Sequence, residues 1–253
     1  MFSTEKIWSD LNTKYIGQNI IYLPETKSTN QDAWKHVENG CENGTLIITD
    51  HQQQGKGRRQ NTWESTPGKS LTFSFVIYPN NNLDKLALLP LLTGLSIVKG
   101  IESSVFIKIG LKWPNDIMLS RKKMGGILIE SKIISNKLSI VVGIGLNINN
   151  SIADFPKEIK DIATSLKIYT EENHSCEQIL AEILNEFEIL YNDNWDAIIS
   201  NWSKYCIHSQ ENISFHTEDG KQKGIFHGLS EDGYAEIIID GNMQTFSTGM
   251  VTL

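Results

Sequence analysis

Arginine is scarce in this chain of 253 residues, which contains only Arg58, Arg59 and Arg121. Basic residues are outnumbered as a group, because 23 lysines and arginines stand against 30 aspartates and glutamates, for a formal net charge of -7. An acidic balance of this size argues against a protein whose whole surface binds nucleic acid or membrane, although it leaves room for a local basic patch.

Cysteine is also rare, with three residues far apart at positions 41, 176 and 206 and no C-x-x-C pair, and the six histidines are scattered. This spacing argues against a disulfide scaffold or a zinc cluster and is typical of a reducing compartment, so we expect a cytoplasmic protein. The sequence also lacks an apolar run of 18 residues and a recognisable secretion signal. We therefore expect neither a membrane span nor export.

What the sequence does contain is a mixture of helix and strand patterns. Residues 28–40 predict a short helix with Ser28 or Thr29 as its N-cap, Asp32 as a capping-box partner and Gly40 as its stop. The other predicted elements are a buried helix over 84–103 that Pro90 bends or interrupts, an amphipathic helix over 176–195, and strands over 45–50, 69–78 (one face buried), 105–120 (strand, turn, strand), 123–134 and 137–149, the last two joined by a turn near 135–136.

The pattern of the sequence changes near residue 206. From there, short β-rich runs alternate with Asp-Gly turns at intervals that are typical of a small β-barrel of about five strands. We therefore predict an α+β protein with two domains. Residues 1–205 form a mixed β-sheet with helices packed on one face, and residues 206–253 form a small barrel.

Two of the three arginines lie together on a glycine-rich loop, residues 52–65, which also carries Lys56. Glycines at positions 55 and 57 let the backbone approach a ligand, and the guanidinium groups of Arg58 and Arg59 suit phosphate or carboxylate. A solvated basic turn would explain the same residues. The alternative is a lid over an anionic ligand.

Three further segments carry polar or charged groups at stiff positions. Pro114 fixes the turn in "KWPND" (112–116), Lys123 precedes Gly125-Gly126 in "RKKMGGILIE" (121–130), and "STN" (28–30) starts a helix. Each segment alone also fits a purely structural role, as a packed turn, a bulged hairpin and a helix cap. Together with the basic loop they predict a site for an anionic nucleotide and a small polar ligand.

The segments "STNQ", "GKGRRQNTWESTPGKSLTFS", "KWPNDI", "KKMGGILIE" and "VVGIGLNIN" resemble, in order and spacing, those of the biotin–protein ligases (biotin–[acetyl-CoA-carboxylase] ligases). The resemblance is strong over residues 28–150. It implies the class II synthetase-like biotin/lipoate ligase fold, and it matches the β-rich end to the small SH3-like C-terminal domain of that family. It also implies biotin and ATP as substrates with Mg²⁺ bridging the phosphates, a biotin carboxyl carrier protein as partner, and a possible homodimer.

The resemblance also assigns site residues. Lys123, Arg58 and Asp116 are the implied catalytic residues, with Asp116 helping the incoming lysine amine. The implied biotin-binding residues are Ser28, Thr29, Asn30, Gln52, Gly55, Lys56, Gly57, Arg58, Lys123 and Gly126. The implied ATP-binding residues are Lys56, Arg58, Arg59, Asn61, Trp63, Asn115 and Asn147. The sequence departs from the family loop at Lys56, which replaces an arginine, and at Gln60-Asn61, where many members have Gly-Arg.

The implied chemistry is activation of biotin to biotinyl-5′-AMP, followed by transfer to a carrier lysine. Neither step needs a nucleophile from the enzyme, which fits a sequence without a Ser/His/Asp or Cys/His constellation. Only 27 residues precede Ser28, too few for the winged-helix domain of the repressor members, so we expect a monofunctional ligase that does not bind DNA. A lipoate or octanoate ligase or transferase of the same fold, a nucleic-acid-binding regulator and an inactive biotin sensor remain the alternatives.

Overall fold

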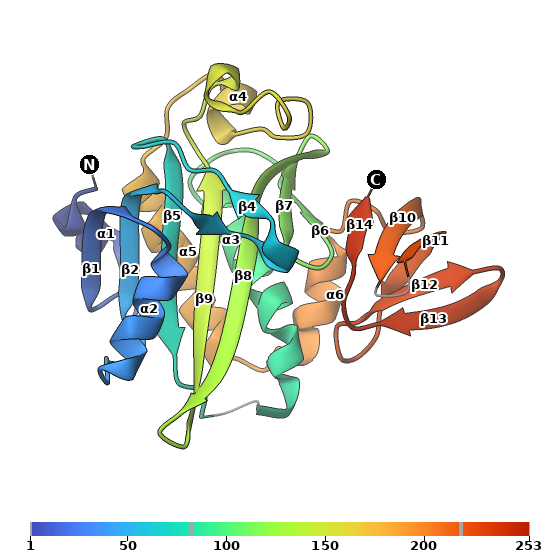
Figure 1. The fold of residues 1–253 in the computed structure, drawn as a ribbon, viewed down its shortest axis with the longest axis horizontal. Coiled ribbons are helices and arrows are strands. Elements are labelled where there is room, and N and C mark those ends of the chain that lie inside the picture. Colours follow the sequence, from blue (N-terminus) through green and yellow to red (C-terminus); the bar gives the residue numbers. More distant parts are fainter. Residues whose placement is uncertain (1, 81–82, 218–219, 253) are drawn as a thin grey trace.

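A seven-stranded mixed sheet forms the centre of the protein in the computed structural model, which describes residues 2–80, 83–217 and 220–252 (Figure 1). Its strand order is β1-β2-β5-β9-β8-β7-β6. Only β1 and β2 pair in parallel, and the other neighbours are antiparallel. The strands are β1 (Ile20–Thr26), β2 (Leu46–Gln52), β5 (Ser70–Ile77), β6 (Gly110–Lys112), β7 (Asp116–Leu119), β8 (Lys122–Ile134) and β9 (Lys137–Asn147).

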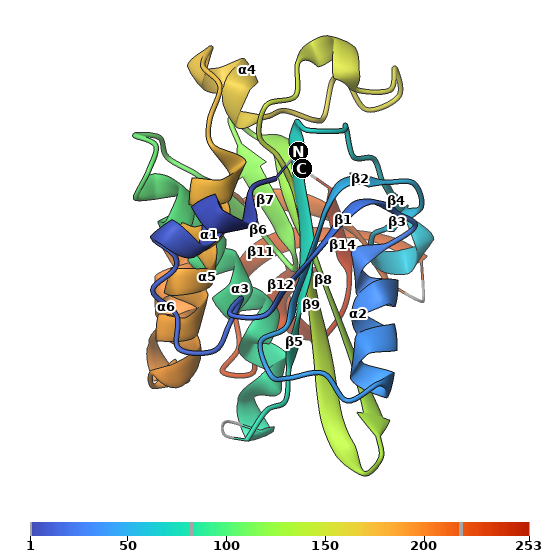
Figure 2. The same ribbon diagram turned by 90° about the vertical axis from the view of Figure 1, so that its left-hand side faces the viewer.

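Helices cover the two faces of this sheet unequally (Figure 2). One face carries most of them, as predicted, whereas the other face carries α2 and the small β3–β4 hairpin. The helices of the crowded face are α1 (Thr4–Asp10), α3 (Leu89–Glu102), α5 (Cys176–Asn192) and α6 (Ile198–Ser203). The elements of the other face are α2 (Thr29–Glu38), β3 (Gly55–Lys56), the 3₁₀ turn η1 (Arg58–Gln60) and β4 (Thr62–Trp63).

The prediction that only one face of the 69–78 strand is buried is wrong. Every residue of β5 is buried, because α2 packs on one side of it and α5 on the other. On the α5 side the rings of Phe75 and Phe187 meet edge to face with centroids 4.7 Å apart, which is a favourable aromatic geometry in the centre of the core.

Two details of the predicted helices are also corrected. Pro90 does not bend a long helix but lies in the first turn of α3, where its missing N–H costs no hydrogen bond, and a 3₁₀ turn, η2 (Leu83–Leu88), precedes it. Ser28 is the N-cap of α2, yet its hydroxyl makes no capping bond. Asp32 does not complete a capping box, because its carboxylate binds the Thr26 hydroxyl and the Lys35 ammonium.

The β8–β9 hairpin follows the prediction closely. Its turn lies at Ser135 and Asn136, both with positive φ, and the two strands pair in continuous register from Ile134–Lys137 to Gly125–Leu146. After β9 the chain makes a long excursion through η3 (Ile152–Asp154) and α4 (Leu166–Thr170), and it then passes through α5 and η4 (Trp195–Ala197) to α6.

The C-terminal region is a five-stranded antiparallel sheet in the order β13-β12-β11-β10-β14. It lies beside β6 and α6 at one end of the large sheet (Figure 1). The strands are β10 (Asn212–Thr217), β11 (Gly220–Leu229), β12 (Ala235–Ile239), β13 (Asn242–Phe246) and β14 (Met250–Thr252). Within the described residues, none of the helices is both long and apolar enough to span a bilayer.

Candidate active site

A cavity opens where the start of α2, the β3–β4 hairpin, the 113–116 turn and β14 meet over β8 and β9. About 910 Å³ of space not occupied by atoms lies within it, a figure that includes the solvent at its open mouth. Most of the predicted site residues line it: Ser28, Thr29, Asn30, Gln52, Lys56, Gly57, Arg58, Arg59, Asn61, Trp63, Asn115, Asp116, Lys123 and Gly126. The structure therefore brings Arg58 and Lys123 to one cavity, although they lie on separate segments.

One end of the cavity is polar and uncharged. Gln52 Oε1 accepts hydrogen bonds from the Thr29 N–H (2.8 Å) and hydroxyl (3.2 Å). The Ser74 hydroxyl lies 2.7 Å from both Thr29 Oγ1 and Asn30 Oδ1. On its other side the Asn30 amide donates to Glu130 Oε2 (2.9 Å). These bonds fix which atoms of the two amide side chains remain to meet a ligand.

Two glycines of β9 make the floor beneath these side chains. A Cβ at Gly143 would lie 2.1 Å from Asn30 Oδ1, and a Cβ at Gly145 would lie 2.4 Å from the Trp63 ring. Because alternate residues of a strand face the same side, Gly143 and Gly145 together let Asn30 and Trp63 rest directly on the sheet.

The other end of the cavity is cationic. Four basic side chains, those of Lys56, Arg58, Arg59 and Lys123, line it against one carboxylate, that of Asp116. This excess of positive charge contrasts with the formal charge of -7 for the whole chain. Partial burial, together with the neighbouring Arg59, lowers the pKa of Arg58. The cationic end is therefore prepared for an anionic ligand.

Asp116 bridges two lysines at this end. Its Oδ1 lies 2.5 Å from Lys123 Nζ and its Oδ2 lies 2.8 Å from Lys112 Nζ. Burial alone would raise the pKa of Asp116, but the charges of Lys123 and Lys112 outweigh it and hold the pKa below its ordinary value. The carboxylate is consequently ionised at neutral pH and is a weak proton acceptor.

The C-terminal strands supply a wall that sequence reasoning missed. Gly249, Met250 and Val251 line the cavity. Arg58 donates to the Thr248 hydroxyl (3.2 Å), and Arg59 donates to the main-chain carbonyl of His216 (3.0 Å). No charged motif in the β-rich end indicates that it lines the cavity, because this contribution depends on where the small sheet packs.

Two predicted residues, Gly55 and Asn147, do not line the cavity. Gly55 lies behind its polar end, where a Cβ would come within 2.5 Å of Gln52 Nε2. Asn147 is buried, and its Nδ2 donates to the Thr164 carbonyl (3.1 Å). Its Oδ1 has no hydrogen-bond partner among the described residues. The other supporting residues that sequence reasoning missed, Ser74 and Glu130, lie in strand patterns that predict only burial.

The part of the chain that the structure describes contains no group of three or more His, Cys, Asp or Glu side chains arranged to hold a metal ion. Among the described residues that line the cavity, Asp116 supplies the one carboxylate, and it is already paired with two lysines. These residues do not fit a resident metal centre.

Comparison with known proteins agrees with this geometry. The model of the biotin/lipoate A/B protein ligase family matches residues 22–147. The bifunctional ligase/repressor BirA of Bacillus subtilis (strain 168) is 34% identical over 236 residues, which cover 91% of this chain and 73% of that protein. The solved biotin protein ligase of Aquifex aeolicus in complex with biotin and ATP is 30% identical, with a TM-score of 0.80 and coverage of 93% of this chain and 98% of that one.

The chain belongs to the biotin/lipoate A/B protein ligase family. A further relative, the biotin–[acetyl-CoA-carboxylase] ligase of Mycobacterium tuberculosis, is 28% identical over 171 residues, or 66% of this chain and 61% of that protein. The family membership and the fold class predicted from the motifs are confirmed.

Proposed function

We propose that this protein is a biotin–protein ligase. It joins biotin to AMP at the expense of ATP and then transfers the biotinyl group to a lysine of a biotin carboxyl carrier protein. The observation that carries the proposal is the division of one cavity into an uncharged polar end and a cationic end. Solved structures of similar proteins support this proposal: the biotin protein ligase of Aquifex aeolicus binds biotin and ATP, and that of Leishmania major binds biotinyl-5-AMP.

The polar end favours biotin over lipoate or octanoate. The ureido ring of biotin has two N–H donors and a carbonyl acceptor that can complete the hydrogen bonding of Thr29, Asn30 and Gln52. A dithiolane ring or an alkyl chain could not pair with the hydrogen-bonding positions that these residues leave open, at a cost of about 1–3 kcal/mol for each buried position. The hydrogen bonds among these residues are therefore what separates the proposed substrate from the closest alternative.

The cationic end suits the first chemical step. A carboxylate oxygen of biotin attacks the α-phosphorus of ATP, the bond to the bridging oxygen breaks and pyrophosphate leaves. Two anions must meet for this reaction, so Lys123 and Arg58 lower the barrier by neutralising the carboxylate and the phosphate. ATP enters as its Mg²⁺ complex, in which the phosphates carry the metal.

In the second step, the acceptor lysine, having lost a proton to solvent, attacks the carbonyl of the mixed anhydride. The bond between that carbon and the phosphate oxygen breaks, AMP leaves, and the new amide nitrogen gives its extra proton to solvent. The low pKa of Asp116 makes it a poor general base, so we assign it the role of orienting the incoming neutral amine by accepting a hydrogen bond from it. Lys56, Arg59, Asn61, Trp63 and Asn115 are assigned to the nucleotide. Gly55 and Asn147 are assigned supporting places behind the cavity. Homodimerisation and a cytoplasmic location stay predictions.

The test is incubation of the protein with biotin, MgATP and a biotin carrier domain, followed by intact-mass measurement. We expect the carrier to gain one biotinyl group and the protein to catalyse biotin-dependent exchange of pyrophosphate into ATP. Lipoate and octanoate in equal amounts are the matched controls. Acylation of the carrier by either of them in preference to biotin would refute the proposal.

A further inference from the structure

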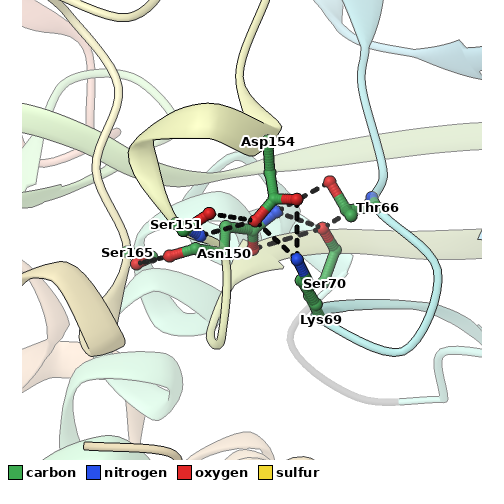
Figure 3. Close-up of polar contacts among 7 residues, drawn as sticks. All are labelled: Thr66, Lys69, Ser70, Asn150, Ser151, Asp154 and Ser165. Atoms are coloured by element: carbon green, nitrogen blue, oxygen red, sulfur yellow. Dashed lines mark hydrogen bonds and ion pairs between the residues drawn. The ribbon is translucent and has the colours of Figure 1, made fainter. Parts of the chain in front are cut away.

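A polar cluster outside the cavity lies where the chain leaves β9 (Figure 3). Lys69 Nζ contacts both carboxylate oxygens of Asp154, at 2.7 and 2.8 Å. Asp154 Oδ2 also accepts from the N–H (2.7 Å) and the hydroxyl (2.6 Å) of Ser151. These hydrogen bonds hold the pKa of Asp154 at about 2, so the carboxylate is charged under all ordinary conditions.

Asn150 extends the cluster into the interior. Its side chain is almost fully buried and donates from Nδ2 to Thr66 Oγ1 (3.0 Å) and Ser70 Oγ (3.1 Å). Its main-chain carbonyl accepts from the Ser165 hydroxyl (2.6 Å). Together with the ion pair, these contacts fasten the start of the β9–α4 segment (residues 148–165) to the turn before β5 (Figure 3).

The far end of the β9–α4 segment reaches the catalytic lysine. The Lys123 N–H donates to the Ile162 carbonyl (2.7 Å), and the Lys123 carbonyl accepts from the Thr164 N–H (2.9 Å). The last pair between β8 and β9 is Gly125–Leu146, so beyond it residues 162–164 take the place of β9 along this edge of β8. The main chain of Lys123 is thus held by the β9–α4 segment.

Long irregular segments have little to hold them except such contacts, because each ordered residue loses backbone entropy of about 1–2 kcal/mol. Between η3 and residue 162 the β9–α4 segment contains no helix or strand. Its shape therefore depends on contacts near its two ends. The Lys69–Asp154 cluster holds the first part, and the main chain of Lys123 together with Asn147 Nδ2, which donates to the Thr164 carbonyl (3.1 Å), holds the last part.

We propose that Asp154 is a positioning residue for adenylate formation: by binding Lys69 and Ser151 it fixes the β9–α4 segment so that residues 162–164 hold Lys123 in place. The inference rests on the proposed function, since Lys123 matters only if the protein activates biotin. Asp154 itself does not line the cavity. Its effect passes through the main chain to a side chain that does.

The test uses full-length Asp154→Asn and Lys69→Met, which break the ion pair from either side while Lys69→Met leaves the Ser151 bonds intact. Asp196→Asn is the matched control, because Asp196 forms a similar ion pair with Lys85 (2.5 Å) away from the cavity. We expect kcat for biotinyl-adenylate formation to fall 10- to 100-fold in both cluster variants, with the KM for biotin changed less than threefold, since displacements of about 1 Å have such effects on rate.

Two further measurements separate positioning from general damage. In a Lys123→Ala background, Asp154→Asn should lower the residual rate by less than twofold, because its effect passes through Lys123. Amide hydrogen exchange in the peptide that contains Lys123 should speed up in Asp154→Asn and not in Asp196→Asn.

Cluster variants with wild-type kcat, a full additional loss in the Lys123→Ala background, or unchanged exchange at Lys123 would each overturn the assignment alone. A wild-type chain that forms no adenylate would overturn the proposed function and the assignment together.

Discussion

Glu130 shows how the ligand-facing atoms of the site depend on a residue that does not line the cavity. Its Oε2 accepts from both Asn30 Nδ2 (2.9 Å) and Trp34 Nε1 (3.1 Å). A carboxylate can only accept, so the amide nitrogen of Asn30 must face Glu130 and the amide oxygen must face Ser74 and the cavity. The orientation of one amide thus decides whether the cavity offers an acceptor or a donor.

Glu130→Leu should raise the KM for biotin about tenfold, since a lost buried hydrogen bond costs about 1–2 kcal/mol, and should leave the KM for ATP within twofold. Steady-state pyrophosphate exchange measures both constants. Glu130→Gln keeps an acceptor oxygen and is the control, with a smaller expected change. An equal rise of both KM values would show that Glu130 does not act through Asn30.

Arg58 offers a second test at this scale. Arg58→Ala should slow adenylate formation about 100-fold or release free biotinyl-adenylate, because a cation aimed at the developing charge is lost. Arg58→Lys, which keeps the charge but not the planar fork, should recover part of the rate. Single-turnover assays with quenched samples distinguish the two defects, and unchanged rates with a retained adenylate would contradict the assignment.

Among the elements, β9 does more for the site than its pattern of apolar residues indicated. Gly143 and Gly145 were visible in the sequence, but a glycine in a strand can mark a bulge, a bend or a close approach. Here both glycines mark a close approach, because α2 and the β3–β4 hairpin cross β9 at these positions. Neither crossing can be deduced from the residues of β9.

Gly143→Ala should raise the KM for biotin more than tenfold, because the added methyl would lie 2.1 Å from Asn30 Oδ1 and displace that side chain. Gly228→Ala is the matched control, a strand glycine of β11 with open space where its Cβ would be. Isothermal titration with biotin measures the effect directly. Equal affinities in the two variants would mean that Asn30 does not contact the ring.

The sequence was sufficient for the elements with strong periodicity and for the residues with distinctive chemistry. The β8–β9 hairpin and α5 were predicted because their patterns are long, and Arg58, Lys123 and Asp116 because charges in stiff turns are unusual. It was insufficient where a role depends on distant packing. The 84–103 segment was predicted as one helix that Pro90 bends or interrupts, because η2 carries the same apolar density as α3; the helix instead begins next to Pro90. The Asp154 cluster was missed because it consists of common surface residue types.

Buried and charged contacts join the small C-terminal sheet to the segments that surround the large sheet. Trp113 Nε1 donates to the Gly233 carbonyl (3.2 Å), and Arg121 binds Glu211 with two hydrogen bonds. His208, in the same C-terminal region, is fully buried against Phe226 of β11. Burial, with Lys112 nearby, lowers the pKa of His208 to about 4.

This histidine should make the junction sensitive to acid. An unfolded histidine takes up a proton below pH about 6.5, whereas His208 in the folded protein stays neutral down to pH about 4. Its contribution is therefore complete above pH about 6.5 and is lost as the pH falls towards 4, with a loss of about 2–3 kcal/mol in the free energy of unfolding.

Urea titrations at pH 7 and pH 4.5 measure this loss, and His208→Phe should reduce the difference between the two by about 2 kcal/mol. His227→Gln, at an exposed position on β11 next to Phe226, is the control. An unchanged difference in His208→Phe would place the acid sensitivity elsewhere.

The C-terminal wall of the cavity has a consequence for how the enzyme is made. Translation delivers the α2 start, the basic loop and the Lys123 strand long before Gly249, Met250 and Val251 emerge, and domains tend to fold in that order. A nascent chain would therefore hold an incomplete cavity, open on the side where the small C-terminal sheet later packs. Any mixed anhydride formed at that stage would be lost to water, so productive turnover begins only once the last wall has arrived.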